Sequence, residues 1–164
     1  MNLVLIGMSG AGKSTLGVLL AKSLALEFID TDIIIQKAEA RLLQDIIYQV
    51  GVEAFLKIEE KVVSNLKKDN AVIATGGSVV YSPVTMESLK SNAKIIYLYV
   101  SFEEIKKRIN NINSRGIAMK KGYNLKDVYN ERIPLYERYA DIIVDCSNKS
   151  IEQSLDEILL NLNV

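Results

Sequence analysis

The stretch "LIGMSGAGKST", residues 5–15, decides the fold. From Gly7 to Ser14 it fits the pattern GxxxxGK[ST] of the Walker A phosphate-binding loop. The apolar run "NLVLI" before it is typical of a buried parallel strand. After it, leucines recur at helical spacing over residues 16–24. A strand, a glycine-rich loop and a helix in this order predict a nucleotide site rather than a turn with a chance lysine.

The loop supplies the groups that a nucleoside triphosphate needs. Glycine lets the backbone come close to a phosphate, because no Cβ is in the way. Successive N–H groups then point inward, and the start of the following helix adds positive potential. In this motif Lys13 reaches the β- and γ-phosphates, and the Ser14 hydroxyl binds Mg²⁺.

Composition narrows the class of protein. The chain of 164 residues is long enough for one domain and too short for two domains of ordinary size. Basic and acidic residues number 20 each, which disfavours nucleic acid or an anionic membrane as a partner. With no histidine, proton transfer depends on carboxylates, lysine, tyrosine or water. A single cysteine, Cys146, suits a reducing compartment, and no apolar run reaches membrane-spanning length. We expect a cytoplasmic monomer.

Apolar runs and helical periodicities alternate along the chain. Candidate strands cover residues 2–6, 27–29, 71–75, 94–100 and 141–144. Candidate helices cover residues 13–25, 33–49 with a possible break, 52–68, 83–89, 102–111, 125–139 and 151–162. Strands separated by helices pair in parallel, and ligands bind at their carboxyl ends. The pattern predicts a single α/β domain, a three-layer α/β/α sandwich around a five-stranded parallel sheet.

The segment "NNINSRGIAMKKGYN", residues 110–124, interrupts this alternation. It is rich in asparagine, glycine and lysine and has little periodicity, as expected of a mobile loop. Phosphoryl transfer requires water to be excluded, and a closing lid does so. Arg115 near its middle favours a lid over an ordinary surface connection.

Two carboxylates follow the second predicted strand, at Asp30 and Asp32 in "FIDTDIII". If the chain stays extended there, both side chains point the same way, toward the γ-phosphate. One would hold Mg²⁺ through water, and the other would orient or deprotonate an acceptor hydroxyl. Asp32 also suits the N-cap of a helix over "IIIQKAEA". After the third strand, Gly76 and Gly77 permit close approach of a ligand, or form a plain tight turn.

Taken together, the motifs resemble those of the shikimate kinases. The set consists of "GMSGAGKST", "DTD", "FLKIEE", "TGG", an arginine in the lid and "RIPLYERYAD". Their order and intervals match over nearly the whole chain. The resemblance implies a P-loop kinase that uses ATP and Mg²⁺ to phosphorylate shikimate to shikimate 3-phosphate, a step of aromatic amino-acid biosynthesis.

The resemblance also implies roles for individual residues. The residues implied to bind ATP are Gly10, Ala11, Gly12, Lys13, Ser14, Thr15, Arg108 and Arg115. Those implied to hold Mg²⁺ are Ser14 and Asp30. Those implied to bind shikimate are Asp32, Gly76, Gly77 and Arg132, the last through the carboxylate. The catalytic residues would be Lys13, Asp32 and Arg115.

Several positions depart from the family pattern. Leu56 stands where the family carries an arginine that helps bind the substrate carboxylate, and Lys57 lies about 100° further round a helix. Lysine lacks the planar fork that suits a carboxylate, although we still predict Lys57 as a substrate contact. Ser78 replaces a third glycine, and the lid reads Arg115-Gly116-Ile117 without the family's proline. Loss of one member of a buried charge pair weakens binding tens to thousands of fold, at about 2–5 kcal/mol, unless Arg132 or Lys57 compensates.

These departures leave other functions open. One alternative is a kinase for another small hydroxylated acid or for a nucleoside monophosphate. Another is a degenerate homologue, which would bind ATP without turnover. A guanine-specific switch would need an NKxD motif, and "NKSI" at residues 148–151 lacks the aspartate.

Overall fold

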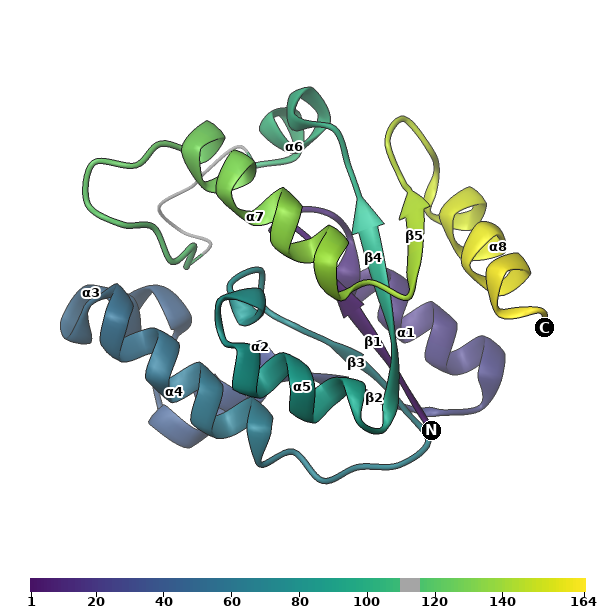
Figure 1. Cartoon of the computed structure of the whole chain (residues 1–164), viewed down its shortest axis with the longest axis horizontal. Coiled ribbons are helices and arrows are strands. Elements are labelled where there is room, and N and C mark those ends of the chain that lie inside the picture. Colours follow the sequence, from purple (N-terminus) through teal and green to yellow (C-terminus); the bar gives the residue numbers. More distant parts are fainter. Residues whose placement is uncertain (110–115) are drawn as a thin grey trace.

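A five-stranded parallel sheet forms the centre of the protein, seen in a computed structural model that describes residues 1–109 and 116–164 (Figure 1). The strand order is β2-β3-β1-β4-β5, and every neighbouring pair is parallel. The strands are β1 (Asn2–Ile6), β2 (Glu27–Asp30), β3 (Ala71–Ala74), β4 (Ala93–Tyr99) and β5 (Ile142–Asp145). Strand β1 is central and buried along its whole length, which explains why its sequence is apolar throughout.

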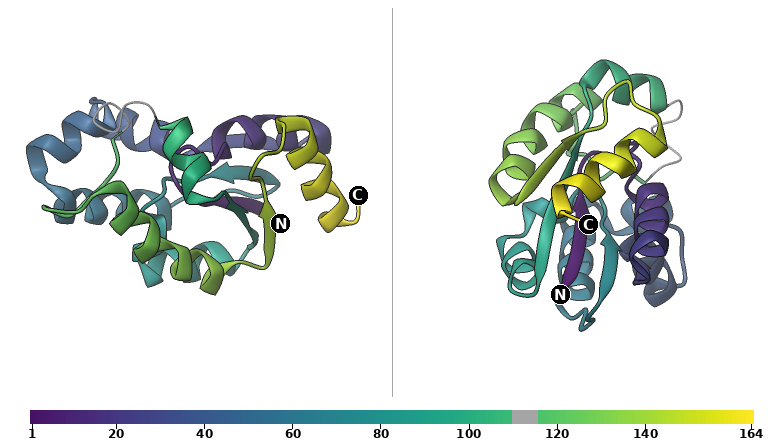
Figure 2. Two further views of the ribbon diagram at one scale, coloured as in Figure 1. Left: turned by 90° about the horizontal axis from the view of Figure 1, so that it is seen from above. Right: turned by 90° about the vertical axis from the view of Figure 1, so that its right-hand side faces the viewer.

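Helices cover both faces of the sheet, as the right-hand view of Figure 2 shows. Before β4 the helices are α1 (Lys13–Leu24), α2 (Thr31–Glu39), α3 (Leu43–Val50), α4 (Val52–Ser64), the 3₁₀ turn η1 (Val79–Tyr81) and α5 (Pro83–Lys90). After it they are α6 (Phe102–Arg108), α7 (Leu125–Tyr139) and α8 (Ile151–Leu162). Helices α5 and α7 lie on one face and α1 on the other, with α8 packed on α1 and β5 (Figures 1 and 2). The predicted three-layer architecture is confirmed.

The element boundaries differ from the predicted ones in a few places. The first helix after β2 begins at Thr31 rather than at residue 33, and the possible break in the predicted helix over residues 33–49 is confirmed between α2 and α3, where Ala40 takes a left-handed conformation with φ 52°. Helix α4 ends at Ser64 rather than at residue 68, and the side chain of its C-cap residue, Asn65, donates a hydrogen bond to the Lys61 carbonyl (2.7 Å). Helix α6 ends at Arg108, and residues 110–111 of the predicted helix lie outside the described residues.

A second, smaller core lies beside the sheet, under helices α2, α3 and α4. Its buried members are Ile35, Leu43, Ile46, Phe55 and Ala118. Ala118 belongs to the segment predicted as a lid, so the described end of that segment packs onto these helices. This packing forms one wall of the candidate site.

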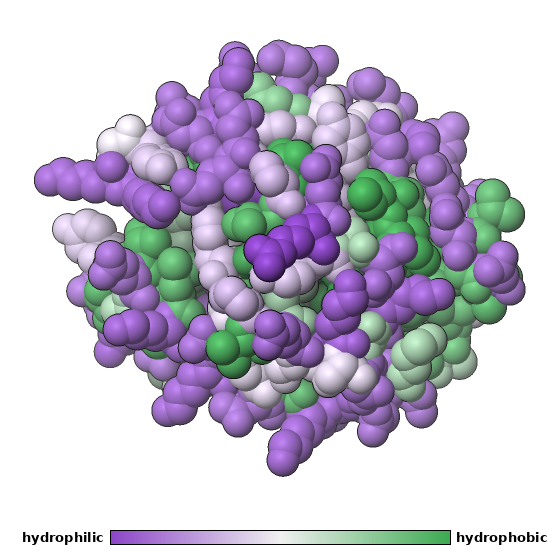
Figure 3. All heavy atoms as spheres, in the orientation of Figure 1, coloured by the Kyte–Doolittle hydropathy of each residue, from purple (hydrophilic) through white to green (hydrophobic). Residues whose placement is uncertain are grey.

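The face of the molecule in Figure 3 is mainly hydrophilic, with apolar atoms gathered toward its right-hand side. Among the exposed apolar side chains are Ile143 of β5 and Leu160 of α8. In the described part of the chain, no helix combines the length and the apolarity needed to cross a membrane.

Candidate active site

The loop between β1 and α1 has the backbone geometry of a phosphate site. Gly7, Gly10 and Gly12 all have positive φ angles, of 145°, 83° and 97°. A Cβ on Gly7 would lie 2.7 Å from the Leu98 carbonyl oxygen, so this turn has room for glycine only. Gly12 precedes α1 without a side-chain cap, which leaves the first amides of the helix facing outward for an anion.

Lys13 lies folded into this loop. Its Nζ donates hydrogen bonds to the carbonyls of Gly7 (2.7 Å) and Met8 (2.8 Å). Burial lowers the pKa of Lys13 to about 8, and the nearby carboxylate of Asp32 opposes that shift. The loop carbonyls and the Asp32 carboxylate therefore stabilise the Lys13 ammonium. Lys13 also lines the cavity of about 410 Å³ that the loop borders.

Ser14 and Asp30 lie together, as the prediction of a shared Mg²⁺ requires. The Ser14 hydroxyl donates to Asp30 Oδ2 (2.7 Å). The other carboxylate oxygen, Oδ1, accepts from the backbone N–H groups of Asp32 (3.0 Å) and Ile33 (3.4 Å). A hydroxyl and a carboxylate beside a phosphate loop are the oxygen ligands that Mg²⁺ takes in nucleotide sites, so the donor set fits this ion.

The same contacts correct the prediction for this turn. Asp30, and not Asp32, is the N-cap of α2. The chain is not extended from Asp30 to Asp32, because the helix begins at Thr31. Asp32 lies in the first helical turn and still faces the loop, since it lines the loop cavity together with Lys13. Burial, followed by the repulsion of Asp30, raises the pKa of Asp32 to about 6, while Lys13 opposes the shift.

A second, small cavity of about 30 Å³ adjoins the first. Four residues line both cavities and mark the border between them: Ser9, Asp32, Gly76 and Gly77. The other residues that line the small cavity are Leu43, Phe55, Glu59, Ser78, Gly116, Ile117, Ala118 and Arg132. Among the described residues that line the small cavity, Arg132 is the one with a positively charged side chain. Asp32 therefore lies between a phosphate loop on one side and an arginine on the other.

Arg132 is held deep in the protein, at 1% exposure. Its Nη2 donates to the Ala118 carbonyl (2.7 Å), and its Nε donates to the Tyr81 hydroxyl (3.3 Å). A Cβ on Gly77 would lie 2.7 Å from Nη1, so the third nitrogen faces the glycine turn. These contacts fix the guanidinium with one edge toward the small cavity.

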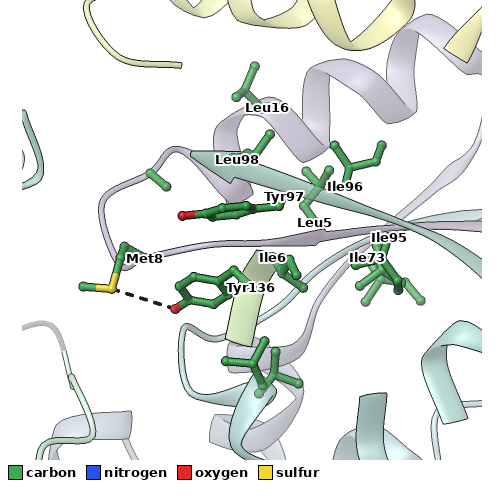
Figure 4. Packing of buried hydrophobic residues seen from close by; sticks show 14 of the residues in the cluster. Leu5, Ile6, Met8, Leu16, Ile73, Ile95, Ile96, Tyr97, Leu98 and Tyr136 are labelled. Atoms are coloured by element: carbon green, nitrogen blue, oxygen red, sulfur yellow. Dashed lines mark hydrogen bonds between the residues drawn. The ribbon is translucent and has the colours of Figure 1, made fainter. Parts of the chain in front are cut away.

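Tyr136 also holds the glycine turn. Its ring stacks on Tyr97, with centroids 5.1 Å apart, and its hydroxyl donates to the Gly77 carbonyl (2.6 Å). Figure 4 shows Tyr136 reaching toward Met8 of the phosphate loop. Helix α7 thus connects the phosphate loop with the turn at Gly77, a contact that the sequence did not reveal.

The glycine turn leads to a first prediction. Replacing Gly76 by alanine should raise KM for the acceptor by at least about tenfold and leave ATP affinity within about twofold of wild type. The reason is that a Cβ would lie 2.7 Å from Glu59 Oε1 and 2.8 Å from Asp32 Oδ1, inside the small cavity. Steady-state kinetics and nucleotide titration check this, and an unchanged acceptor KM would contradict it.

The predicted site residue Arg108 lies on the nucleotide side. Arg108, at the end of α6, donates to the carbonyls of Gly10 (3.4 Å) and Cys146 (3.2 Å) and forms an ion pair with Glu104. It lines the loop cavity, as do Gly10, Gly12 and Thr15, while Ala11 is buried beneath the loop. Arg115 lies outside the described residues.

Lys57 does not join the small cavity. It is exposed on α4 and, with Leu56, lines a separate hollow of about 330 Å³ between α4, η1 and α5. Neither residue is among those that line the cavity of Asp32 and Arg132. The contact of Lys57 with the substrate stays a prediction, and the position of Lys57 outside the small cavity does not support it.

Glu59 was not predicted as a site residue, although the motif "FLKIEE" contains it. It is 3% exposed, and its Oε2 accepts a hydrogen bond from the Ser78 hydroxyl (2.7 Å). Burial raises its pKa to about 7, against the effect of the Ser78 hydrogen bond. The signal in the sequence was its spacing of four residues from Phe55, which places a carboxyl group on the buried face of α4.

The fold and the site define a class, the P-loop kinases that act on small molecules: a phosphate loop opens onto a cavity that holds a carboxylate and an arginine. The family model for shikimate kinase matches residues 9–163. The chain belongs to the shikimate kinase family.

Relatives and solved structures agree with this assignment. The shikimate kinase of Francisella tularensis subsp. holarctica is 37% identical over 161 residues, 96% of this chain and 92% of that protein. The shikimate kinase of Enterococcus faecalis is 34% identical over 164 residues, 98% of each. The structure of shikimate kinase from Acinetobacter baumannii in complex with shikimate matches with a TM-score of 0.89 at 28% identity, over 99% of this chain and 93% of that one. The shikimate kinase of Aquifex aeolicus matches with a TM-score of 0.83 at 32% identity, over 99% and 96%.

Proposed function

We propose that the protein transfers the γ-phosphoryl group of ATP, with Mg²⁺, to a hydroxyl of shikimate and so forms shikimate 3-phosphate. The observation that carries this proposal is the position of Asp32, Gly76 and Gly77 on the border between the loop cavity and the cavity of Arg132. An acceptor whose carboxylate rests on Arg132 presents a hydroxyl to Asp32 and to the loop. Family membership and the match to a shikimate complex support the choice of acceptor.

Each residue then has a defined task. The loop amides and Lys13 bind the phosphates and spread the charge of a loose transition state. Ser14 and Asp30 would hold Mg²⁺, which supplies further positive charge to the phosphates when bound. Asp32 orients the acceptor hydroxyl for in-line attack and takes its proton. We infer that Arg115 joins this group from the lid segment, and that the protein works as a cytoplasmic monomer.

Entry of the acceptor requires the wall of the small cavity to move. A volume of about 30 Å³ holds about one water molecule and not a ring acid. A Cβ on Gly116 would lie 2.7 Å from Leu43 Cβ, so residues 116–118 rest closely against α3. Lifting this segment opens the cavity, and its return excludes water from the bound substrates.

A coupled assay of ADP release tests the proposal. Purified protein with Mg²⁺ and ATP should release ADP on addition of shikimate, and not on addition of nucleoside monophosphates. Turnover of a nucleoside monophosphate alone would identify the alternative kinase class. ATP binding without turnover of any acceptor would identify a degenerate homologue.

Activity should depend on pH through Asp32. Because burial raises the pKa of Asp32 to about 6, its protonated form predominates below that value and cannot accept the hydroxyl proton. We expect kcat/KM for shikimate to fall about tenfold per pH unit below pH 6, and to level off above it until Lys13 begins to lose its proton near its pKa of about 8. Rates measured from pH 5 to 8, with nucleotide binding measured in parallel, check this. A rate independent of pH down to 5 would contradict the role of Asp32.

A further inference from the structure

The hollow between α4, η1 and α5 takes no part in the reaction described above. Helices α4 and α5 pack side by side, and η1 contacts both of them (Figure 1). The hollow has a volume of about 330 Å³, which is enough for a small organic molecule. It adjoins the small cavity, because Glu59 and Ser78 line both. A molecule in the hollow would therefore lie beside the acceptor without touching the phosphate loop.

The walls of the hollow are mainly apolar. Leu56, which is half-buried, lines it from α4, and Val79 of η1 and Pro83 of α5 line it from the two other elements. Contact with such walls removes apolar surface of a ligand from water. The hollow therefore favours a molecule with an apolar or aromatic body.

The charged groups around the hollow carry an excess of negative charge. Among the described lining residues, three are glutamates and one is a lysine: Glu53, Glu59, Glu60 and Lys57. Three of these four follow one another at intervals of four and three residues along α4, so they project from one side of the helix. The Glu60 carboxylate is held in place, since it accepts from the Ser82 hydroxyl (2.5 Å). This arrangement attracts an ammonium group and repels an anion such as shikimate.

Tyr81 connects the hollow with the arginine of the small cavity. Its side chain lines the hollow, and its hydroxyl accepts from Arg132 Nε (3.3 Å). The guanidinium carbon of Arg132 lies 5.3 Å from the centroid of the Tyr81 ring. A molecule that packs against Tyr81 from the hollow restricts this ring, and with it the guanidinium that the ring supports. Binding in the hollow is thus coupled to the orientation of Arg132.

We propose that this hollow is a second ligand site, which binds a small ammonium compound with an apolar or aromatic body and thereby strengthens acceptor binding. The ammonium group lies on Glu53 and Glu60, and the body packs against Leu56 and Tyr81. The site goes beyond the proposed function, and only its effect on the acceptor rests on that function.

Titration of ¹⁵N-labelled protein with phenethylamine, followed by NMR, tests the site. We expect saturable binding with a Kd on the order of 0.1–1 mM. The amide signals that shift should be those of Leu56, Val79 and Tyr81 rather than those of the phosphate loop. The anion 3-phenylpropionate has a similar aromatic body and should bind at least about tenfold more weakly. Titration without saturation, shifts confined to the phosphate loop, or equal binding of both compounds would overturn the site.

Two variants test the position of the ligand. Glu60→Gln should raise the Kd about three- to tenfold, because it removes one negative charge while the amide can still accept from Ser82. Leu56→Lys should raise the Kd more than about 30-fold, because it adds a like charge and removes apolar contact, and it decides if Glu60→Gln does not fold. The matched control is Glu87→Gln, since Glu87 is exposed on α5 and does not line the hollow. Wild-type Kd values in both test variants would overturn the site.

Acceptor kinetics test the coupling through Tyr81. Saturating phenethylamine should lower KM for shikimate about two- to fivefold and leave KM for ATP unchanged. Tyr81→Phe should still bind phenethylamine but lose this effect, because the new ring cannot accept a hydrogen bond from Arg132. A KM for shikimate that does not respond to phenethylamine would overturn the coupling. Wild-type protein that leaves shikimate unphosphorylated would contradict the proposed function instead, since the NMR titration tests the site without turnover.

Discussion

Replacing Asp32 by asparagine should lower kcat for shikimate phosphorylation by about 10²- to 10⁴-fold. Asparagine keeps the size of the side chain and its place in the first turn of α2, but it cannot take the proton of the acceptor hydroxyl. ATP affinity should change little, because the loop amides and Lys13 remain. Single-turnover kinetics and nucleotide titration separate these two effects.

The same variant should be more stable than wild type at pH 8. Burial raises the pKa of Asp32 to about 6 in the folded protein, above the value of about 3.9 for an unfolded chain. The folded state thus holds the proton more tightly, so ionised Asp32 destabilises the fold above pH 6 and has no such effect below about pH 4. We expect Asp32→Asn to raise the free energy of unfolding by about 1–3 kcal/mol at pH 8 and by nearly nothing at pH 4.

Asp45→Asn is the control for both measurements. Asp45 occupies the first turn of α3 as Asp32 does in α2, but its side chain is exposed and lines neither cavity. It should keep wild-type kcat and nearly wild-type stability. A wild-type kcat in Asp32→Asn would show that Asp32 is not a catalytic residue. A lower free energy of unfolding for Asp32→Asn at pH 8 would show that the carboxylate stabilises the fold.

Replacing Arg132 by methionine should raise KM for shikimate by tens to thousands of fold, equivalent to about 2–5 kcal/mol. Arg132 is the cation among the described residues that line the small cavity, so the acceptor carboxylate would be left buried without a partner. Methionine keeps the apolar stem of the side chain but lacks the guanidinium, so the Ala118 carbonyl and the Tyr81 hydroxyl each lose a hydrogen bond. Thermal unfolding with and without ATP shows whether the variant is folded.

Arg138→Met is the matched control for this substitution. Arg138 lies on the same helix, is exposed and stacks on Tyr139, with 5.6 Å between guanidinium carbon and ring centroid. It should leave KM for shikimate unchanged. If Arg132→Met also keeps the wild-type KM, the acceptor carboxylate binds elsewhere, and the hollow that Leu56 and Lys57 line becomes the place to examine.

The nucleotide half of the site follows from local sequence. The positive φ angles at Gly7, Gly10 and Gly12 are consequences of a motif that is contiguous in the chain. Parallel pairing of alternating strands then brings the carboxyl ends of β1, β2 and β3 to one edge. Periodicity therefore sufficed for the three-layer architecture.

The acceptor half depends on packing that periodicity does not specify. Helix α4 buries Phe55, Glu59 and Val63, which recur every four residues, and this choice of face turns Leu56 and Lys57 away from the small cavity. Which side of the helix meets the glycine turn is decided by its packing against α2, α3 and α5. The spacing from Phe55 places Glu59 on the buried face of α4, but the sequence pattern alone could not reveal that this face, and not Lys57, lines the small cavity.

The turn after β2 reaches the expected place by a local geometry that differs from the predicted one. The sequence analysis considered Asp32 as the N-cap of the following helix, and it expected an extended chain from Asp30 to Asp32. The structure gives the cap to Asp30, which starts α2 at Thr31 and places Asp32 one turn into the helix. Asp32 reaches the border of the two cavities through helical geometry and not through an extended strand.

A crystal structure with shikimate, ADP and Mg²⁺ bound tests the central claim most directly. We expect the shikimate carboxylate on the Arg132 guanidinium, a hydroxyl within hydrogen-bond distance of Asp32, and that hydroxyl directed at the phosphate loop. Shikimate bound in the hollow of Leu56 and Lys57, or with its hydroxyl groups turned away from Asp32, would contradict the account.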